Sequence, residues 1–268
     1  MACHNRKYKT MQAVTSLAEG SPHIDFAFFI VDDHSTDGTR EALLELKPRY
    51  DIRILPGNGS LFYSKSMNLA MDYLKKQGGR NFQYVLLFND DVCFYPEAVE
   101  KMIRQSKEHG QAVIAGSTID HKGIQSYGAV KYMDHSIRYK MLPPGEDGVL
   151  ADTFNGNCVL VPWEVFVRHE SMDPSYAHSM GDFDYGMMLK EQRVAIYGSK
   201  EYVGRCESNP AAGTWLDPSL SFFSRIRKKE SRKGLPLRDW FHYLKKYFGL
   251  KTALWHSITP YVKILIHR

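Results

Sequence analysis

The first half of the chain alternates short apolar runs with longer segments whose apolar residues recur at helical spacing. Apolar runs with polar boundaries predict buried strands over residues 26–31, 51–55, 84–88 and 112–117. The segments between them end at Pro or Gly, which predicts helices over residues 40–48, 64–78 and 96–109. We expect the second of these helices to close at Gly78-Gly79. Strands that alternate with helices are typical of an α/β fold with right-handed crossovers and a mostly parallel sheet.

The pattern changes after residue 122. Short segments with strand character predict hairpins that extend the sheet and make it mixed, over residues 123–134, 136–142 and 152–161. Two further helices are expected over residues 162–169 and 181–193, with a loop between them.

Composition places the chain among globular proteins. It has 268 residues, of which 43% are hydrophobic, enough for one large domain or two small ones. No window reaches the roughly 18–20 continuous apolar residues of a membrane span, and the first residues lack the pattern of a signal peptide. Because the four cysteines have no CxxC spacing, the sequence disfavours a disulfide framework or zinc knuckle and favours a reducing, cytoplasmic setting.

Charge is distributed unevenly along the chain. Residues 221–268 contain 12 Lys and Arg against Glu230 and Asp239, a net +10, so the remaining residues carry (35 − 12) − (30 − 2) = −5. This pattern predicts a mildly acidic body over residues 1–218 and a basic helical tail over residues 219–268 that meets something anionic.

One stretch of the tail, "LRDWFHYLKKYFG", has a helical face of aromatic and apolar residues with Lys245 and Lys246 beside it; its members are Trp240, Phe241, Leu244, Tyr247 and Phe248. This face either packs on the body or lies on an anionic membrane surface as an amphipathic helix. In the second case the protein is peripheral on the inner face of the membrane. Basic-aromatic stretches also bind nucleic acid, but nothing upstream resembles a nucleic-acid module, so no such partner is expected.

Acidic residues gather in three loops: Asp32-Asp33, Asp90-Asp91, and Asp182 with Asp184. The first two pairs follow predicted buried strands, and ligands of open α/β sheets bind at the carboxyl ends of strands. An aspartate at such an end is often only a turn former or a helix cap. Adjacent carboxylates repel each other, however, and a divalent cation that also binds a diphosphate explains such pairs.

Five segments in order resemble family-2 inverting glycosyltransferases of the GT-A fold, and more weakly the members that act in bacterial surface-polysaccharide synthesis and rhamnosyl transfer. They are "VDDHSTDGT", "GNGSLFYSKSMNLA", "LLFNDDV", "FNGNCVLVPWEVF" and "GDFDYGMML", and "ACHNR" is similar to the family's first nucleotide-binding loop. The resemblance implies a GT-A catalytic domain over residues 1–218. Its nucleotide-binding half would span about 1–117 and its acceptor-binding half about 118–218.

The resemblance also implies roles for single residues. Asp182 matches the catalytic base, Asp91 matches the metal ligand for Mg²⁺ or Mn²⁺, and Asp33 matches the acid that binds the donor's base. The full set implied for the nucleotide and donor sugar is Cys3, His4, Asn5, Arg6, Asp33, Lys65, Asn68, Asn89 and Asp90. The set implied on the acceptor side is Asn155, Gly156, Asn157 and Asp184. His4 is equally compatible with an ordinary surface position, and Asp184 with a helix cap. For Lys65 a solvated helix face is favoured over contact with a phosphate.

The sequence departs from the family pattern at three places. Only Met1 and Ala2 precede "CHNR", so the first strand is almost missing; Gly181 replaces a usual Glu before the base; and Cys206 stands near the place of a late histidine. A thiol is a poor ligand for Mg²⁺, so we expect the metal to rest on Asp91, the diphosphate and water.

Taken together, these features predict a metal-dependent inverting hexosyltransferase. Its expected donor is a UDP- or dTDP-sugar, and its expected acceptor a glycan or lipid-linked saccharide of the cell surface. A degenerate sugar-nucleotide-binding or scaffold protein and a sugar nucleotidyltransferase are the alternatives.

Overall fold

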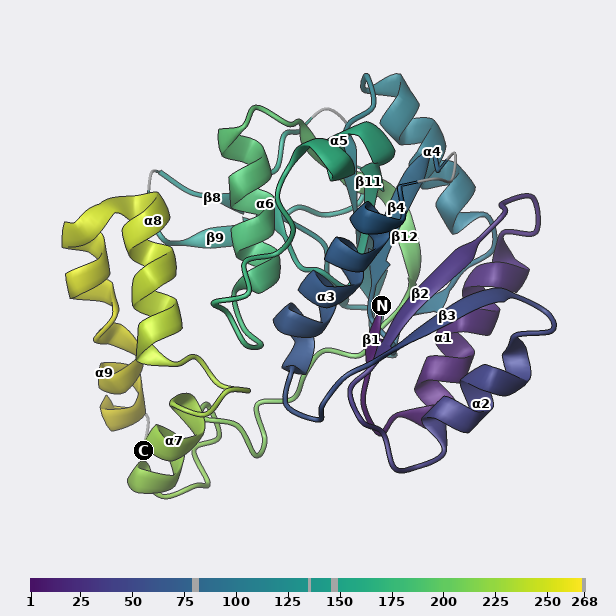
Figure 1. The fold of residues 1–268 in the computed structure, drawn as a ribbon. Coiled ribbons are helices and arrows are strands. Elements are labelled where there is room, and N and C mark those ends of the chain that lie inside the picture. Colours follow the sequence, from purple (N-terminus) through teal and green to yellow (C-terminus); the bar gives the residue numbers. More distant parts are fainter. Residues whose placement is uncertain (79–81, 135, 146–148, 267–268) are drawn as a thin grey trace.

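The computed structural model describes residues 1–78, 82–134, 136–145 and 149–266 (Figure 1). The strands are β1 (Ala2–Cys3), β2 (Ala27–Asp32), β3 (Asp51–Pro56), β4 (Tyr84–Phe88), β5 (Cys93–Phe94), β6 (Val113–Ile119), β7 (Gln125–Tyr127), β8 (Ala129–Tyr132), β9 (Tyr139–Met141), β10 (Thr153–Phe154), β11 (Cys158–Pro162) and β12 (Ile196–Arg205). The helices are α1 (Lys7–Gly20), α2 (Thr39–Leu46), α3 (Phe62–Gln77), α4 (Ala98–Glu108), α5 (Trp163–Arg168), α6 (Gly181–Glu191), α7 (Phe222–Lys229), α8 (Leu237–His256) and α9 (Thr259–Ile266).

The strands form a mixed arrangement. In the first sheet β1, β2 and β3 pair in parallel, in that order. The second sheet has the order β4-β11-β6-β12-β5, with β7 beside β6; β12 and β6 are parallel, whereas β11 is antiparallel to both of its neighbours. A small antiparallel sheet, β10-β8-β9, completes the set. The predicted α/β class with a mixed, helix-flanked sheet is therefore confirmed. The expectation that the sheet is mostly parallel is wrong, because six of the nine strand pairings among the described residues are antiparallel.

Two apolar cores cover the sheet faces. One is formed with α1, α2 and α4 and includes Leu17, Leu43 and Met102. The other is formed with α3, α5 and α6 and includes Met67 and Phe166. Packing on both faces explains why the strand over residues 84–88 reads as a continuous apolar run, and its predicted bounds are those of β4.

Several predicted elements are confirmed, and three elements were not predicted. The strand at 112–117 and the helices at 64–78 and 181–193 correspond to β6, α3 and α6 within a few residues. The residue that ends α3, Gly78, adopts the left-handed conformation with φ 40°, whereas Gly79 lies outside the described residues. Sequence patterns missed α1, β5 and β12.

The tail folds onto one side of the body, beside α6 and β8–β9, with α1 and α2 on the opposite side (Figure 1). Tyr243 and Leu244 of α8 are fully buried, and Tyr243 shares a small core with Tyr176 and Met187. The aromatic face of α8 therefore packs on the body, as one of the two interpretations expected. The final residues of the predicted tail, 267 and 268, lie outside the described residues. Among the described helices, none combines the length and apolarity that a membrane crossing requires.

Candidate active site

Arg6 joins the first loop of the chain to the paired aspartates that follow β4. Its Nη1 donates hydrogen bonds to Asp90 Oδ1 at 3.0 Å and to Asp91 Oδ2 at 2.9 Å. The preceding residue, Asn5, fixes this loop, since its Oδ1 accepts a hydrogen bond from the Thr36 amide at 2.7 Å. The loops after β1, β2 and β4 thus meet at one edge, as expected for the carboxyl ends of parallel strands.

Burial shifts the pKa of one member of this pair, Asp90. Desolvation raises the pKa of Asp90 to about 6, although the positive charge of Arg6 opposes the shift. In return, Asp90 and Asp91 raise the pKa of Arg6 despite its desolvation.

Cys206 lies against the other oxygen of Asp91. Its thiol is 3.5 Å from Asp91 Oδ1, and the side-chain amide of Asn157 donates to the sulfur at 3.5 Å. Burial and the Asp91 charge raise the pKa of Cys206 to about 12, so at neutral pH it remains a thiol that donates to the carboxylate. In this structure the thiol therefore serves as a hydrogen-bond donor to Asp91.

Asp182 sits in the first turn of α6, half-buried, with both oxygens engaged by amides. Gly156 N donates to Oδ2 at 2.8 Å and Phe183 N to Oδ1 at 2.9 Å. Desolvation still raises its pKa above the ordinary value, against these two bonds. A carboxylate with a raised pKa at the head of a helix is suited to accept a proton.

Two glycines permit the close contacts around Asp182. A Cβ on Gly156 would lie 2.1 Å from the hydroxyl of Tyr63 and 3.0 Å from Asp182 Cβ. A Cβ on Gly181 would lie 2.3 Å from Ser64 Oγ. At Gly181, α6 therefore packs directly on α3, with no room for a side chain unless Ser64 moves.

One loop connects the two carboxylate sites. Gly156 binds Asp182, and the next residue, Asn157, binds Cys206 beside Asp91 and accepts a hydrogen bond from Asn89 N at 3.0 Å. Asp91 and Asp182 thus flank the same short loop between β10 and β11. The side-chain oxygen of Asn89 is buried there without a partner in the described structure.

The carboxylate of Asp33 is engaged by hydrogen bonds within the protein. Its two oxygens accept hydrogen bonds from three backbone amides, those of Gly59, Leu61 and Phe62, at 2.7–3.1 Å. The side chain of His4 contacts Asp33 O through Nδ1 at 2.6 Å. Asp33 therefore shapes the loop before α3, which borders the site.

Other residues of the predicted set lie away from this cluster or are engaged elsewhere. Asp184 is buried and binds the tail, through Lys246 Nζ at 2.8 and 3.0 Å and Tyr247 OH at 3.0 Å. Asn68 donates to Met172 O at 2.7 Å. Lys65 is exposed, and its charge acts on Asp239 of α8.

Two further predicted residues contribute backbone contacts. Cys3 is buried in β1 and accepts a hydrogen bond from Asp33 N at 3.0 Å through its carbonyl. Asn155 N donates to Gly128 O at 3.0 Å, next to Gly156.

Sequence patterns did not point to three residues that border the site. Tyr63 donates to Gly156 O at 3.1 Å. The ring of His178 lies 6.4 Å from that of Tyr63, burial lowers its pKa, and its Nδ1 has no partner in the described structure. Arg232 stacks over Phe62 at 5.6 Å. A histidine in the loop that leads to Asp182 was a visible signal, but its contact with Tyr63 depends on the fold.

The residues suit a metal ion that is shared with a bound diphosphate better than one held by protein ligands alone. Among the described residues no group of three or more His, Cys, Asp or Glu side chains converges on a point. Mg²⁺ and similar ions need only one or two carboxylates when phosphate oxygens and water supply the rest. Asp91 and Asp90 meet this requirement, with Arg6 as the positive charge that neutralises the pair here.

Comparison with known proteins gives one family and several similar solved structures. The family model described as "Glycosyl transferase family 2" matches residues 1–158. Among solved structures, the chain is similar to mannosyltransferase PcManGT from Pyrobaculum calidifontis in complex with GDP-Man and Mn²⁺, with a TM-score of 0.57, 10% identity, and coverage of 99% of this chain and 72% of that one.

Two other solved structures are similar at comparable levels. For S. aureus TarS 1-349 the TM-score is 0.54 with 13% identity, covering 99% of this chain and 79% of that one. For GalNAc-T7 with UDP, GalNAc and Mn²⁺ the TM-score is 0.61 with 13% identity, covering 97% of this chain and 53% of that one. At these identities the similarity shows the fold.

Proposed function

The chain belongs to glycosyl transferase family 2 and is thus a glycosyltransferase, and on this premise we propose an inverting, metal-dependent hexosyl transfer. The proposed donor is a UDP- or dTDP-sugar, and the proposed acceptor is a hydroxyl of a glycan or lipid-linked saccharide in cell-surface polysaccharide synthesis. The observation that carries the proposal is the loop at 155–157, which places Asp182 on one side and Asp91 on the other.

In the proposed reaction the acceptor hydroxyl attacks the anomeric carbon of the donor. The bond from the acceptor oxygen to that carbon forms as the bond from the carbon to the diphosphate oxygen breaks. Asp182 takes the hydroxyl proton, for which its raised pKa is suitable. The amides of Gly156 and Phe183 hold the carboxylate in place, and Asp182 ends the step as the carboxylic acid.

The leaving nucleoside diphosphate gains negative charge, which positive groups at the other side of the site stabilise. Arg6 is one such group. Mg²⁺ or Mn²⁺, when bound, would supply further positive charge to the diphosphate and would be held by Asp91, with Asp90 beside it. The loop ordered by Asp33, and the side chain of His4 that contacts Asp33 O, would border the nucleotide base.

Membrane association of the tail is the second part of the proposal, because its outer face is apolar and basic. Several large apolar residues beyond the kink at Gly249 or on α7 and α9 are exposed. Between 45% and 81% of the surface of each is accessible, and they are Phe223, Leu250, Leu254, Trp255, Ile258, Val262, Leu265 and Ile266. Lys251 and Lys263 lie among them and are exposed. This composition suits an anionic lipid surface, where each basic residue contributes about 1 kcal/mol, and it would bring a lipid-linked acceptor to the site.

The transfer is tested by incubating purified protein with a panel of nucleotide sugars and Mn²⁺ and measuring release of the nucleoside diphosphate. We expect turnover of a UDP- or dTDP-sugar, loss of nucleotide binding in Asp91→Ala, and loss of turnover with retained binding in Asp182→Asn. Nucleotide binding without turnover by the unsubstituted protein, over a broad acceptor panel, would instead support a scaffold.

The membrane proposal is tested separately by sedimentation with vesicles of phosphatidylglycerol or of phosphatidylcholine. We expect binding to the anionic vesicles that weakens with salt and is reduced in Trp255→Ser. Equal recovery of both proteins in the supernatant would refute it and leave the transferase proposal intact.

A further inference from the structure

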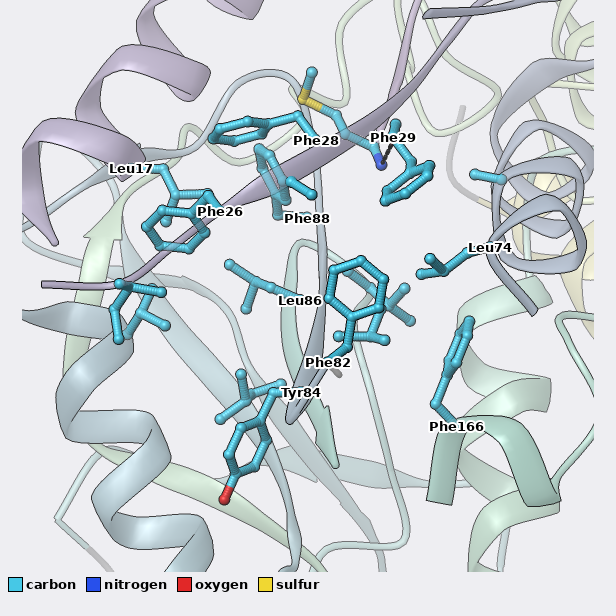
Figure 2. Close-up of a pocket in the computed structure, with 18 of the residues that line it drawn as sticks. Leu17, Phe26, Phe28, Phe29, Leu74, Phe82, Tyr84, Leu86, Phe88 and Phe166 are labelled. Carbon is cyan, nitrogen blue, oxygen red and sulfur yellow. Dashed lines mark hydrogen bonds between the residues drawn. The ribbon is translucent and has the colours of Figure 1, made fainter. Parts of the chain in front are cut away.

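A cavity of about 610 Å³ between β2 and β4 is lined mostly by apolar side chains. Figure 2 shows Phe28 and Phe29 of β2 facing Leu86 and Phe88 of β4 across it. None of the described residues that line this cavity is a Lys or an Arg, so it offers no strong positive charge to a phosphate. Positive charge without a carboxylate partner is found instead where the tail meets the candidate active site.

The loop over residues 230–236 (the tail loop) joins α7 to α8 and lies against two segments that border the site. Ser179 Oγ donates a hydrogen bond to Gly234 O at 2.5 Å, a contact with the segment that leads into α6. Arg232 Nη1 donates to Ser60 O at 3.4 Å, a contact with the loop before α3. The match to the family model does not extend to the tail loop, yet this loop forms part of the border of the site.

The tail loop folds back onto the end of α7, and its one acid is engaged there. A Cβ on Gly234 would lie 2.2 Å from Lys228 O and 2.5 Å from Lys229 O, so the loop lies directly on the helix. The acid is Glu230, whose carboxylate accepts hydrogen bonds from Lys229 Nζ and Tyr261 OH, both at 2.6 Å. Because these bonds hold Glu230 at α7, it does not neutralise the basic residues that follow it in the loop.

Two basic residues of the tail loop, Arg232 and Lys233, have no carboxylate partner among the described residues. Arg232 contacts a backbone carbonyl and the ring of Phe62, whose centroid lies 5.6 Å from its guanidinium carbon. Lys233 is exposed. Both therefore keep a full positive charge at the border of the site, and like charges held close together attract an anion.

The charges of Lys233 and Arg6 act on one side chain, that of His178. Burial lowers the pKa of its imidazole, and these two charges lower it further. Since charges are screened beyond roughly 10 Å, both cations approach the same ring. The Nδ1 atom of this ring is buried without a hydrogen-bond partner in the described part of the chain. Arg6 already binds Asp90 and Asp91, so Lys233 and His178 are the members of the group that have capacity for a ligand.

We propose that Lys233 and His178, with Arg232 beside them, form a phosphate-binding site through which the tail loop completes the active site. A lysine ammonium binds phosphate oxygens as a point charge, and an arginine guanidinium binds them through two parallel N–H groups. A neutral imidazole adds one N–H donor. The assignment of that phosphate to a substrate rests on the proposed function, which offers two sources, the diphosphate of the donor and the phosphate of a lipid-linked acceptor.

The first test is calorimetric titration of the purified protein with inorganic pyrophosphate, without a divalent metal and at constant ionic strength. We expect Lys233→Gln and His178→Phe each to weaken binding by about 10-fold or more, since each removes a hydrogen bond to a charged group. The matched control is Lys228→Gln, which removes an exposed positive charge from α7 and should change the affinity by less than about two-fold. Unchanged affinity in Lys233→Gln, or no binding of millimolar pyrophosphate by the unsubstituted protein, would overturn the proposal. Unchanged affinity in His178→Phe alone would remove His178 from the site.

Two further ligands show which substrate supplies the phosphate. UDP with Mn²⁺ represents the donor, and farnesyl diphosphate represents a lipid-linked acceptor. A loss of affinity for UDP in Lys233→Gln assigns the site to the donor, and a loss for farnesyl diphosphate assigns it to the acceptor. Equal affinities of the variant and the unsubstituted protein for both ligands would overturn the inference that the site serves a substrate. Failure of the proposed function has a different result, namely absent turnover of nucleotide sugars by a protein that still binds pyrophosphate through Lys233.

Discussion

The contact of Gly156 with Tyr63 and Asp182 offers a test of the site by a double-mutant cycle. In Gly156→Ala the new methyl group would lie 2.1 Å from the Tyr63 hydroxyl, so the loop or α3 must move. Overpacking of this kind costs about 1–3 kcal/mol, and displacement of the Gly156 amide from Asp182 weakens a charged hydrogen bond. We expect a lower free energy of unfolding and a fall in turnover of one to two orders of magnitude, the equivalent of about 1.4–2.7 kcal/mol.

Tyr63→Phe supplies the matched partner of the cycle. It removes the hydroxyl and its bond to Gly156 O, a loss of about 1 kcal/mol, and leaves the ring carbon 3.2 Å from the new methyl group. The double variant should therefore be more stable and more active than Gly156→Ala alone. Urea unfolding and initial rates of nucleotide-sugar hydrolysis measure both effects. Additive losses in the double variant would refute the proposed contact.

Three other predictions concern single substitutions and pH. Lys246→Met should lower the free energy of unfolding by about 1.5–3 kcal/mol, because it leaves buried Asp184 without its cation. The control is Lys245→Met on the same exposed turn, which should lower it by less than about 0.5 kcal/mol in urea titrations. Equal losses in the two variants would contradict the role of the Lys246–Asp184 pair. Asp33→Ala should destabilise the protein by on the order of 2–3 kcal/mol, because three amides lose their acceptor, whereas unchanged thermal unfolding would argue that the loop does not depend on it. Since the pKa of Asp182 is raised above 3.8, its base form is lost as pH falls through that higher pKa, so a pH–rate profile should show turnover declining on the acid side above pH 3.8; a flat acid limb would exclude it as the base.

Sequence patterns located the elements that bury one continuous apolar run or one distinct apolar face. β4 is the best case, since a five-residue apolar run between polar boundaries has few other interpretations. In α1 only Thr10, Ala13, Val14 and Leu17 are buried among 14 residues, so the helical pattern is weak. In β12 the strand is interrupted by exposed residues and two register shifts, which erase the alternation.

The site residues were predictable where a single local motif identifies them. Their contacts were unpredictable where residues far apart in the sequence meet in the folded chain. The pairing of Asp90 and Asp91 at a strand end was visible in the sequence. The tail contacts of Asp184 were not, because Lys246 lies 62 residues away. Similarly, the loop amides that bind Asp33 depend on a turn at residues 57–62 whose direction no local pattern gives.

The most direct test of the central claim is a crystal structure of the protein soaked with UDP or dTDP and Mn²⁺, with anomalous scattering recorded to locate manganese. The account predicts one manganese peak in contact with an Asp91 carboxylate oxygen and the diphosphate, with the carboxylate of Asp182 facing the same cleft. A manganese peak and nucleotide bound elsewhere, with Asp91 and Asp182 opening onto different surfaces, would contradict it.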